Sequence, residues 1–142
     1  MNKITNNYKE TQQLAKEFAS QLHGGDVLLL FGDLGSGKTT FMQGLAEGLG
    51  LKRRIISPTF IIMRSYEIKN KKMLYHIDLY RTESQHDLEG LGLPDILQDK
   101  NAIAAIEWPE KLGDLFPKKR WELHFDNLGE DRRSITIEKS VR

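Results

Sequence analysis

The sequence contains Gly32-Asp33-Leu34-Gly35-Ser36-Gly37-Lys38-Thr39-Thr40, which has the spacing G-x-x-x-x-G-K-[ST] of a phosphate-binding loop. An apolar run, Val27–Phe31, precedes it, and a helical pattern through Phe41, Leu45 and Leu49 follows it. A strand, a loop and a helix in this order are the context in which the motif binds a nucleotide. The glycines let the backbone turn tightly, so that successive N–H groups face phosphate oxygens. The sequence therefore predicts a nucleotide site at the start of this helix.

Two side chains of the motif and two acids elsewhere are the candidates for chemistry. Lys38 is expected to reach the β- and γ-phosphates, and the Thr39 hydroxyl is expected to bind Mg²⁺. Hydrolysis also needs an acidic group at the metal. Asp78 and Glu107 each stand at the end of a strand-like run, and Glu107 follows a run without a polar residue, which places it at the carboxyl edge of the sheet. Both acids are expected near the metal, and the residues leave open which one binds it directly.

Five further residues each have two interpretations. Thr59 lies in a proline-bent segment, where its hydroxyl either senses the γ-phosphate or places a water, or else belongs to an ordinary turn. His76 is more often a packing histidine than a catalytic base, and Trp108 either packs over the site or belongs to the core. Arg81 either contacts phosphate or pairs with the preceding acid, whereas Arg133 is either solvated or close to the nucleotide base.

Length and composition set the broad class. The chain has 142 residues, a net charge of +1 and no cysteine. One domain over residues 1–142 is expected. A net charge this close to zero gives no electrostatic reason to expect a nucleic acid or a membrane as partner. The absence of cysteine excludes disulfides and thiolate metal sites. Met1–Tyr8 is polar, unlike a secretory signal, and the longest apolar run is too short to span a bilayer. We therefore expect a soluble cytoplasmic protein.

Around the loop, apolar patterning predicts helices and buried strands. Asn7 as a cap, with Glu10 three positions later, begins a helix of about 12–14 residues that Gly24-Gly25 ends. Val27–Phe31 and Ala102–Ile106 are apolar throughout. This is typical of strands in a parallel sheet whose two faces are both buried.

Other segments predict antiparallel additions to that sheet. Ile61–Ile68 and Met73–Leu79 flank the polar turn Lys69–Lys72, and Trp121–Phe125 and Ser134–Glu138 flank the polar connection Asp126–Arg132. Short helices are expected within Ser84–Leu97, and Ile55-Ile56 could begin a further strand that Ser57-Pro58 interrupts. The predicted fold class is α/β, a P-loop NTPase-like three-layer sandwich with a mixed sheet, parallel at its centre, plus antiparallel hairpins.

Several absent motifs narrow the nucleotide and the reaction. Without Asn-Lys-x-Asp, the usual guanine-reading element is missing and ATP is expected. Without Leu-Ser-Gly-Gly-Gln, a transport-type ATPase dimer is not expected. No arginine-rich lid segment follows the third strand, which argues against a small-molecule kinase.

Four blocks taken together closely resemble the bacterial TsaE family, formerly called YjeE. They are Gly32–Phe41, Ser57–Phe60, His76–Arg81 and Ile106–Glu110, and the likeness extends from the N-terminal helix to Arg133. The family supplies the ATPase component of the threonylcarbamoyladenosine (t6A) system, which modifies adenosine 37 of tRNAs that read codons beginning with A. The resemblance implies ATP and Mg²⁺ as cofactors. It also implies the TsaB and TsaD proteins as partners, with TsaD performing the transfer and tRNA approached indirectly through the complex.

The resemblance also implies roles for single residues. Gly35 to Thr40 would bind the ATP phosphates, and Thr39 and Glu107 would ligate Mg²⁺. Asp78 and Trp108 fall on positions tied to hydrolysis, and Ser57 to Phe60 on a switch-like loop that contains Thr59. Thr11 and Arg133 lie where the family's chain ends approach the adenine, and Ser36 replaces an alanine that many members carry.

Three functions from different classes stay open at this point. The first is a partner-dependent ATPase of tRNA modification, slow in isolation. The second is a small kinase that passes the γ-phosphate to an acceptor, and the third is a nucleotide-binding regulatory module without useful turnover. Their products differ: inorganic phosphate, a phosphorylated acceptor, or neither.

Overall fold

The computed structural model describes residues 1–52, 55 and 62–141. Within them one seven-stranded mixed sheet has the order β1-β7-β6-β2-β5-β4-β3. The strands are β1 Asn2–Thr5, β2 Val27–Phe31, β3 Met63–Glu67, β4 Met73–Asp78, β5 Ala102–Glu107, β6 Arg120–Gly129 and β7 Arg132–Ser140. The α-helices are α1 Tyr8–Phe18, α2 Lys38–Gly48, α3 Gln85–Gly90 and α4 Leu93–Gln98. The described residues also contain three 3₁₀ segments: η1 Ala19–Gln21, η2 Lys69–Lys71 and η3 Pro109–Leu115.

The centre of the sheet is parallel and its edges are antiparallel. β2 pairs in parallel with both β5 and β6, and β5 pairs in parallel with β4. The pairs β3–β4, β6–β7 and β1–β7 are antiparallel. This confirms the predicted α/β class with a parallel centre and added hairpins. It also explains why β2 and β5 are apolar throughout, since both lie inside the sheet.

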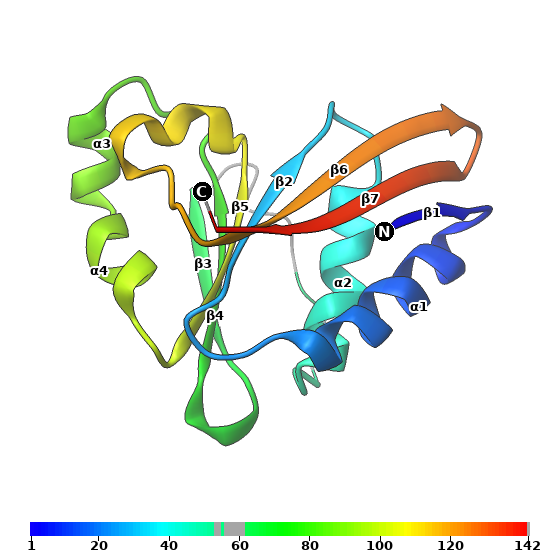
Figure 1. The fold of residues 1–142 in the computed structure, drawn as a ribbon, viewed down its shortest axis with the longest axis horizontal. Coiled ribbons are helices and arrows are strands. Elements are labelled where there is room, and N and C mark those ends of the chain that lie inside the picture. The colour runs from blue at the N-terminus through cyan, green and yellow to red at the C-terminus, as the bar shows by residue number, and fades with distance from the viewer. Residues whose placement is uncertain (53–54, 56–61, 142) are drawn as a thin grey trace.

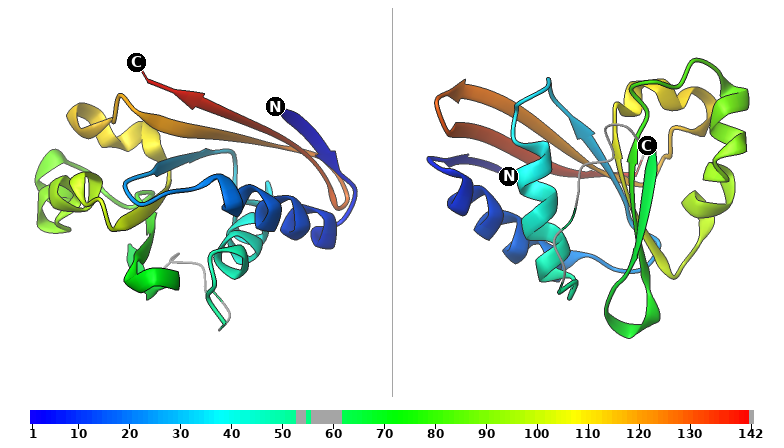
Figure 2. Two further views of the ribbon diagram at one scale, coloured as in Figure 1. Left: turned by 60° about the horizontal axis from the view of Figure 1, so that its bottom comes forward. Right: turned by 180° about the vertical axis from the view of Figure 1, so that it is seen from behind.

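Helices cover both faces of the sheet (Figure 1). On one face α1 and α2 lie side by side and pack on alternate residues of β2, Leu28 and Leu30. On the other face α3, α4 and η3 pack on the remaining residues of β2, Val27 and Leu29. The two further views in Figure 2 show the same separation, with the turn of the β6–β7 hairpin beside β1 and the start of α1. No helix of the described residues is long and apolar enough to cross a bilayer.

The ends of the two long helices follow from local hydrogen bonds. The Asn7 side chain accepts from the Glu10 N–H at 2.9 Å, which begins α1 as predicted. α1 and η1 together end at Gln21, somewhat before the predicted Gly24-Gly25. At the end of α2, Gly50 adopts a φ of 93°, and the Leu51 N–H donates to the Ala46 carbonyl at 3.0 Å. This left-handed turn releases the chain from the helix.

The polar ends of the molecule differ from the sequence prediction. Asp126–Arg132 was predicted as a connection, but most of it extends β6 and β7, which turn only at Glu130 and Asp131. β1 was not predicted at all. Both errors have one cause, because most residues of β1 and of the outer parts of β6 and β7 are polar and exposed, so these segments lack the apolar alternation of a half-buried strand. The predictions for Ile56 to Ile61, which include the Ser57–Phe60 loop and Thr59, lie outside the described residues.

Candidate functional site

The loop between β2 and α2 has a backbone that only glycine fits. Gly32, Gly35 and Gly37 have φ values of 152°, 78° and 102°. A Cβ at Gly32 would lie 2.7 Å from Ser36 Oγ and 2.8 Å from the Phe125 carbonyl oxygen. Gly37 caps α2 without a side-chain hydrogen bond, so the first N–H groups of that helix are left for another acceptor. The loop is therefore shaped to receive an anion at the positive end of α2.

Lys38 is a buried cation at the base of this loop. Only 5% of its surface is exposed. Its Nζ donates to the Gly32 carbonyl and lies 3.7 Å from Glu107 Oε1. The Trp108 ring lies beside it, with its centroid 5.2 Å from Nζ. A buried ammonium is costly without partners, so these neighbours hold Lys38 where phosphate charge would meet it.

The two candidate acids stand side by side. Asp78 ends β4 and Glu107 ends β5, and the two are direct partners in the parallel register. Glu107 is only 6% exposed, and its Oε2 lies 2.7 Å from His76 Nε2. Asp78 is less buried, and its Oδ1 accepts from the Tyr80 N–H at 2.9 Å.

Burial raises the pKa of Asp78, and the neighbouring Glu107 carboxylate adds to that rise. The hydrogen bond from Tyr80 and the Lys38 charge act in the opposite direction on this pKa. Two carboxylates in one partly dry site repel each other, and a cation placed between them and the loop would relieve that repulsion.

The donor set of these residues fits Mg²⁺. The Thr39 hydroxyl and the carboxylates of Asp78 and Glu107 line one pocket and offer hard oxygen ligands. Within the described part of the chain no group of three or more His, Cys, Asp and Glu could hold a metal. A metal ion that takes all its ligands from protein side chains would therefore have too few ligands here. Mg²⁺ usually takes one or two carboxylates and completes its shell with phosphate and water.

One pocket of about 460 Å³ gathers these groups, and we call it the loop pocket. It lies at the N-terminal end of α2, beside the carboxyl ends of β4 and β5. Its lining residues are Leu34, Gly35, Gly37, Lys38, Thr39, Thr40, Asp78, Tyr80, Arg81, Glu107, Trp108 and Arg133. A smaller hollow of about 80 Å³ shares Gly37, Thr40 and Arg133 with it and is also lined by Thr11.

A family model described as "Threonylcarbamoyl adenosine biosynthesis protein TsaE" matches residues 5–135. The chain belongs to the TsaE family. It is 41% identical over 133 residues to the tRNA threonylcarbamoyladenosine biosynthesis protein TsaE of Bacillus subtilis, covering 94% of this chain and 82% of that protein. The TsaE protein of Borreliella burgdorferi is 42% identical over 125 residues, or 87% of this chain and 90% of that one. The crystal structure of Bacillus subtilis YdiB superposes with a TM-score of 0.77 at 32% identity, over all of this chain and 86% of that one.

Most residues expected from the TsaE resemblance are neighbours in the structure. Seven of the expected loop residues and acids, all except Ser36, line the loop pocket together with Trp108 and Arg133. Trp108 was expected either to pack over the site or to belong to the core, and it does both. It lines the loop pocket and also packs against the apolar cluster under α3 and α4. Ser36 differs, since it is buried with its Oγ near Gly32, beneath the loop. A small side chain is therefore required there, as the Ser-for-Ala exchange suggested.

The chain ends that the TsaE resemblance assigns to adenine also meet at the loop. Arg133 packs its side chain over Gly37, at 3.4 Å from the position of a Cβ there. Arg133 Nη1 donates to the Glu130 carbonyl at 2.8 Å and to Asn127 Oδ1 at 3.1 Å. Thr11 is buried, and its hydroxyl lies 2.6 Å from that of Thr5 in β1. The two residues therefore border one hollow beside the phosphate loop.

Sequence reasoning missed an aromatic side chain that lines the loop pocket of this TsaE-family chain, and a lysine that binds the backbone of that aromatic residue. The Tyr80 ring is half exposed and lies 5.1 Å from the Trp108 ring, centroid to centroid. Lys111 Nζ donates to the Tyr80 carbonyl and, at 3.1 Å, to the Thr82 carbonyl. Trp108 itself has a φ of 58°, which is rare for a bulky residue and is found at functional sites. The place of Tyr80, two residues after Asp78, was the available signal.

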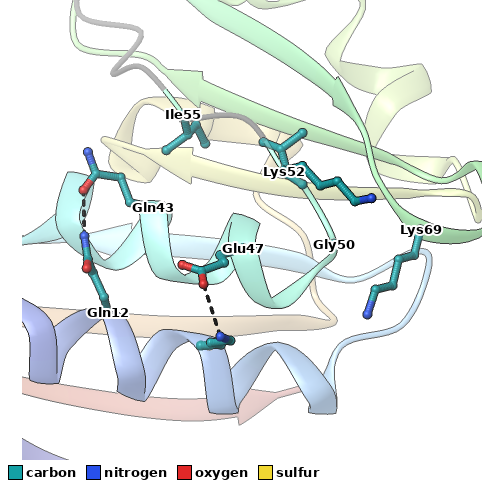
Figure 3. A pocket seen from close by; sticks show the side chains of 9 residues that line it. Gln12, Gln43, Glu47, Gly50, Lys52, Ile55 and Lys69 are labelled. Atoms are coloured by element: carbon teal, nitrogen blue, oxygen red, sulfur yellow. Dashed lines mark hydrogen bonds and ion pairs between the residues drawn. The ribbon is translucent and has the colours of Figure 1, made fainter.

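A second hollow, of about 750 Å³, lies at the opposite end of α2 (Figure 3). We call it the helix-end hollow. It is lined by Gln12, Lys16, Gln43, Glu47, Gly50, Leu51, Lys52, Ile55 and Lys69. A hydrogen bond of 3.0 Å from Gln12 to Gln43 and an ion pair of 3.1 Å between Lys16 and Glu47 join α1 to α2 there. Of the residues expected at the TsaE site, those that the structure describes all lie outside this hollow.

Proposed function

We propose that this chain is the Mg²⁺-dependent ATPase component of tRNA threonylcarbamoyladenosine biosynthesis, formed by a single P-loop ATPase domain over residues 1–142. The observation that carries the proposal is a buried lysine at a glycine loop that faces two paired carboxylates across one pocket. That arrangement suits phosphoryl chemistry, in which catalysis is positioning and charge stabilisation. Membership in the TsaE family supports the pathway.

The residues of the loop would bind ATP through its phosphates. The free N–H groups at the start of α2 and the Lys38 ammonium would share the phosphate charge. To do so, Lys38 would exchange its present hydrogen bond to the Gly32 carbonyl for phosphate oxygens. Thr11 and Arg133 would lie toward the adenine, because their hollow adjoins the loop pocket.

The two acids would have different roles, because they differ in burial. Glu107, which is the more buried and is hydrogen-bonded by His76, would ligate Mg²⁺ together with Thr39. The bound metal would neutralise charge that develops on the phosphates. Asp78, whose pKa is raised and whose carboxylate is more exposed, would orient the attacking water. Trp108 would exclude bulk water from Lys38, over which its ring lies.

Partners are part of the proposal because the pocket mouth is open and partly apolar. Leu34 is 83% exposed and Tyr80 is 55% exposed, and both line the loop pocket. Exposed apolar side chains at the mouth of a charged site favour covering by another protein. The family resemblance names TsaB and TsaD as partners, with tRNA reached through them, and assigns Thr59 to a switch-like loop. We therefore expect the chain alone to hydrolyse ATP slowly, because its pocket mouth is then not covered by the partners.

Phosphate release tests the proposal. It should be slow for the chain alone, faster with the TsaB–TsaD pair, and lost in Lys38→Ala under both conditions. Thr59→Ala with the pair tests the switch-like loop. A phosphorylated acceptor instead of inorganic phosphate would indicate a kinase. Nucleotide binding without any turnover, with or without the pair, would indicate a regulatory module.

A further inference from the structure

His76 is completely buried beneath the loop pocket. It lies on β4, on the face that α1 and α2 cover, and none of its surface is exposed. It does not line the loop pocket, so it touches neither of the expected ligands. Its Nε2 lies 2.7 Å from Glu107 Oε2. In the described part of the chain its other ring nitrogen, Nδ1, is buried without a hydrogen-bond partner.

The sheet register makes room for this contact. His76 is paired in β5 with Ala105, and Glu107 follows two residues later on the same face. The small side chain of Ala105 leaves space for the imidazole to reach across to Glu107. A ring that served only to fill space would be less costly as an apolar ring, because a buried nitrogen without a partner is unfavourable. The hydrogen bond to Glu107 is what compensates for placing a histidine there.

The two oxygens of Glu107 have separate partners. Oε2 accepts from His76, whereas Oε1 lies 3.7 Å from Lys38 Nζ. Once Lys38 turns to phosphate, as the proposed function requires, His76 is the partner that still fixes the carboxylate. A buried carboxylate held through one oxygen presents the other in a defined direction.

We propose that His76 is a positioning residue that holds Oε2 of Glu107, so that Oε1 stays turned toward Mg²⁺ in the loop pocket. This inference rests on the proposed function and deepens it. His76 acts through Glu107 and takes no part in proton transfer. Its effect is therefore on the gain in nucleotide affinity that Mg²⁺ provides, rather than on nucleotide affinity without metal.

Two substitutions of His76 that differ by one methylene test this. Gln reaches about as far as the imidazole Nε2, whereas Asn is too short to reach Glu107. The measurement is calorimetric ADP affinity in excess Mg²⁺ and in EDTA, whose ratio is the magnesium gain. His76→Asn should lower the magnesium gain about tenfold and leave affinity in EDTA within about twofold. His76→Gln should keep most of the gain.

His124→Gln is the matched control. His124 also contacts a glutamate, with Nε2 3.2 Å from Glu122 Oε1, but it lies on β6 outside the loop pocket. Its magnesium gain should equal that of the unmodified chain. If His76→Asn does not fold, His76→Phe replaces it, since Phe keeps the ring volume and lacks the donor.

Each other result overturns the inference. An unchanged magnesium gain in His76→Asn would show that Glu107 needs no support. Equal losses in Mg²⁺ and in EDTA would assign His76 to packing alone, and equal losses in the Gln and Asn variants would exclude the hydrogen bond as the cause. If the unmodified chain binds ADP without any magnesium gain, the inference fails while nucleotide binding stands. If it binds no nucleotide, the proposed function fails as well.

Discussion

The loop pocket and the helix-end hollow lie at opposite ends of α2 and both contain lysine and glutamate, yet they differ in how those charges are held. In the loop pocket Lys38 and Glu107 are almost wholly buried. In the helix-end hollow Lys16 is 50% exposed and its partner Glu47 63%. The helix-end hollow is the larger of the two. Size therefore does not mark the site, whereas buried charge marks it, because desolvated ions are kept only where neighbours or ligands compensate them.

Removing the buried Lys38 cation should have a greater effect on nucleotide affinity than any other change considered below. Lys38→Ala should weaken ATP affinity at least about 30-fold, since truncating one partner of a buried charged contact costs about 2 kcal/mol or more. Lys52→Ala, in the helix-end hollow, is the matched control and should leave affinity unchanged. Calorimetry with circular dichroism as a check of folding measures both. Equal effects of the two variants would remove the distinction between the regions.

The next effect concerns the buried acid. Glu107→Gln should lower the magnesium gain in nucleotide affinity by at least about tenfold, as expected for a metal ligand. Asp78→Asn should lower turnover at nearly normal affinity. Glu47→Gln is the control from the helix-end hollow. Titration of Mg²⁺ against all three variants separates these roles, and the opposite pattern for Asp78 and Glu107 would exchange their assignments.

A smaller effect, on stability, follows from the raised pKa of Asp78. Since the folded pKa lies above the ordinary value of 3.8, the ionised carboxylate destabilises the folded state at neutral pH. That destabilisation is relieved as the pH falls through the raised pKa toward 3.8. In EDTA, Asp78→Asn should therefore raise the melting temperature at pH 7, by only about 1–3 °C because solvent screens a partly exposed group. The difference should shrink in melts at low pH, and a lower melting temperature at pH 7 would contradict the repulsion.

The same contrast decides what the sequence could predict. The apolar β2 and β5 and the motif between β2 and α2 were predicted correctly, because buried parallel strands and a glycine loop have distinctive residues. Placement of Asp78 and Glu107 at strand ends followed from the same patterns. β1 and the outer parts of β6 and β7 could not be predicted, since exposed strands have no apolar alternation.

Contacts that depend on how the strands pair could not be predicted from the sequence either. The hydrogen bond from His76 to Glu107 needs β4 beside β5 with Ala105 opposite the ring. The contact of Tyr80 with Trp108 needs the segments that follow β4 and β5 to lie together, and Lys111 joins the same segments through the Tyr80 carbonyl. Strand order and loop closure result from packing of the whole sheet, which no local pattern encodes.

The smallest expected effect comes from the ion pair of the helix-end hollow. Lys16 and Glu47 are both well exposed, and such pairs contribute about 0.2–1 kcal/mol because water and side-chain entropy offset the attraction. Glu47→Gln should therefore lower the melting temperature by no more than about 2 °C. Added salt, about 0.5 M, should remove even this difference, because it shortens the range of the attraction between exposed charges to about 4 Å. Glu107→Gln in the same salt should keep its full loss of magnesium gain, because its partners are buried. If salt erased both effects alike, exposure would not separate the two regions, and the argument that buried charge marks the site would fail.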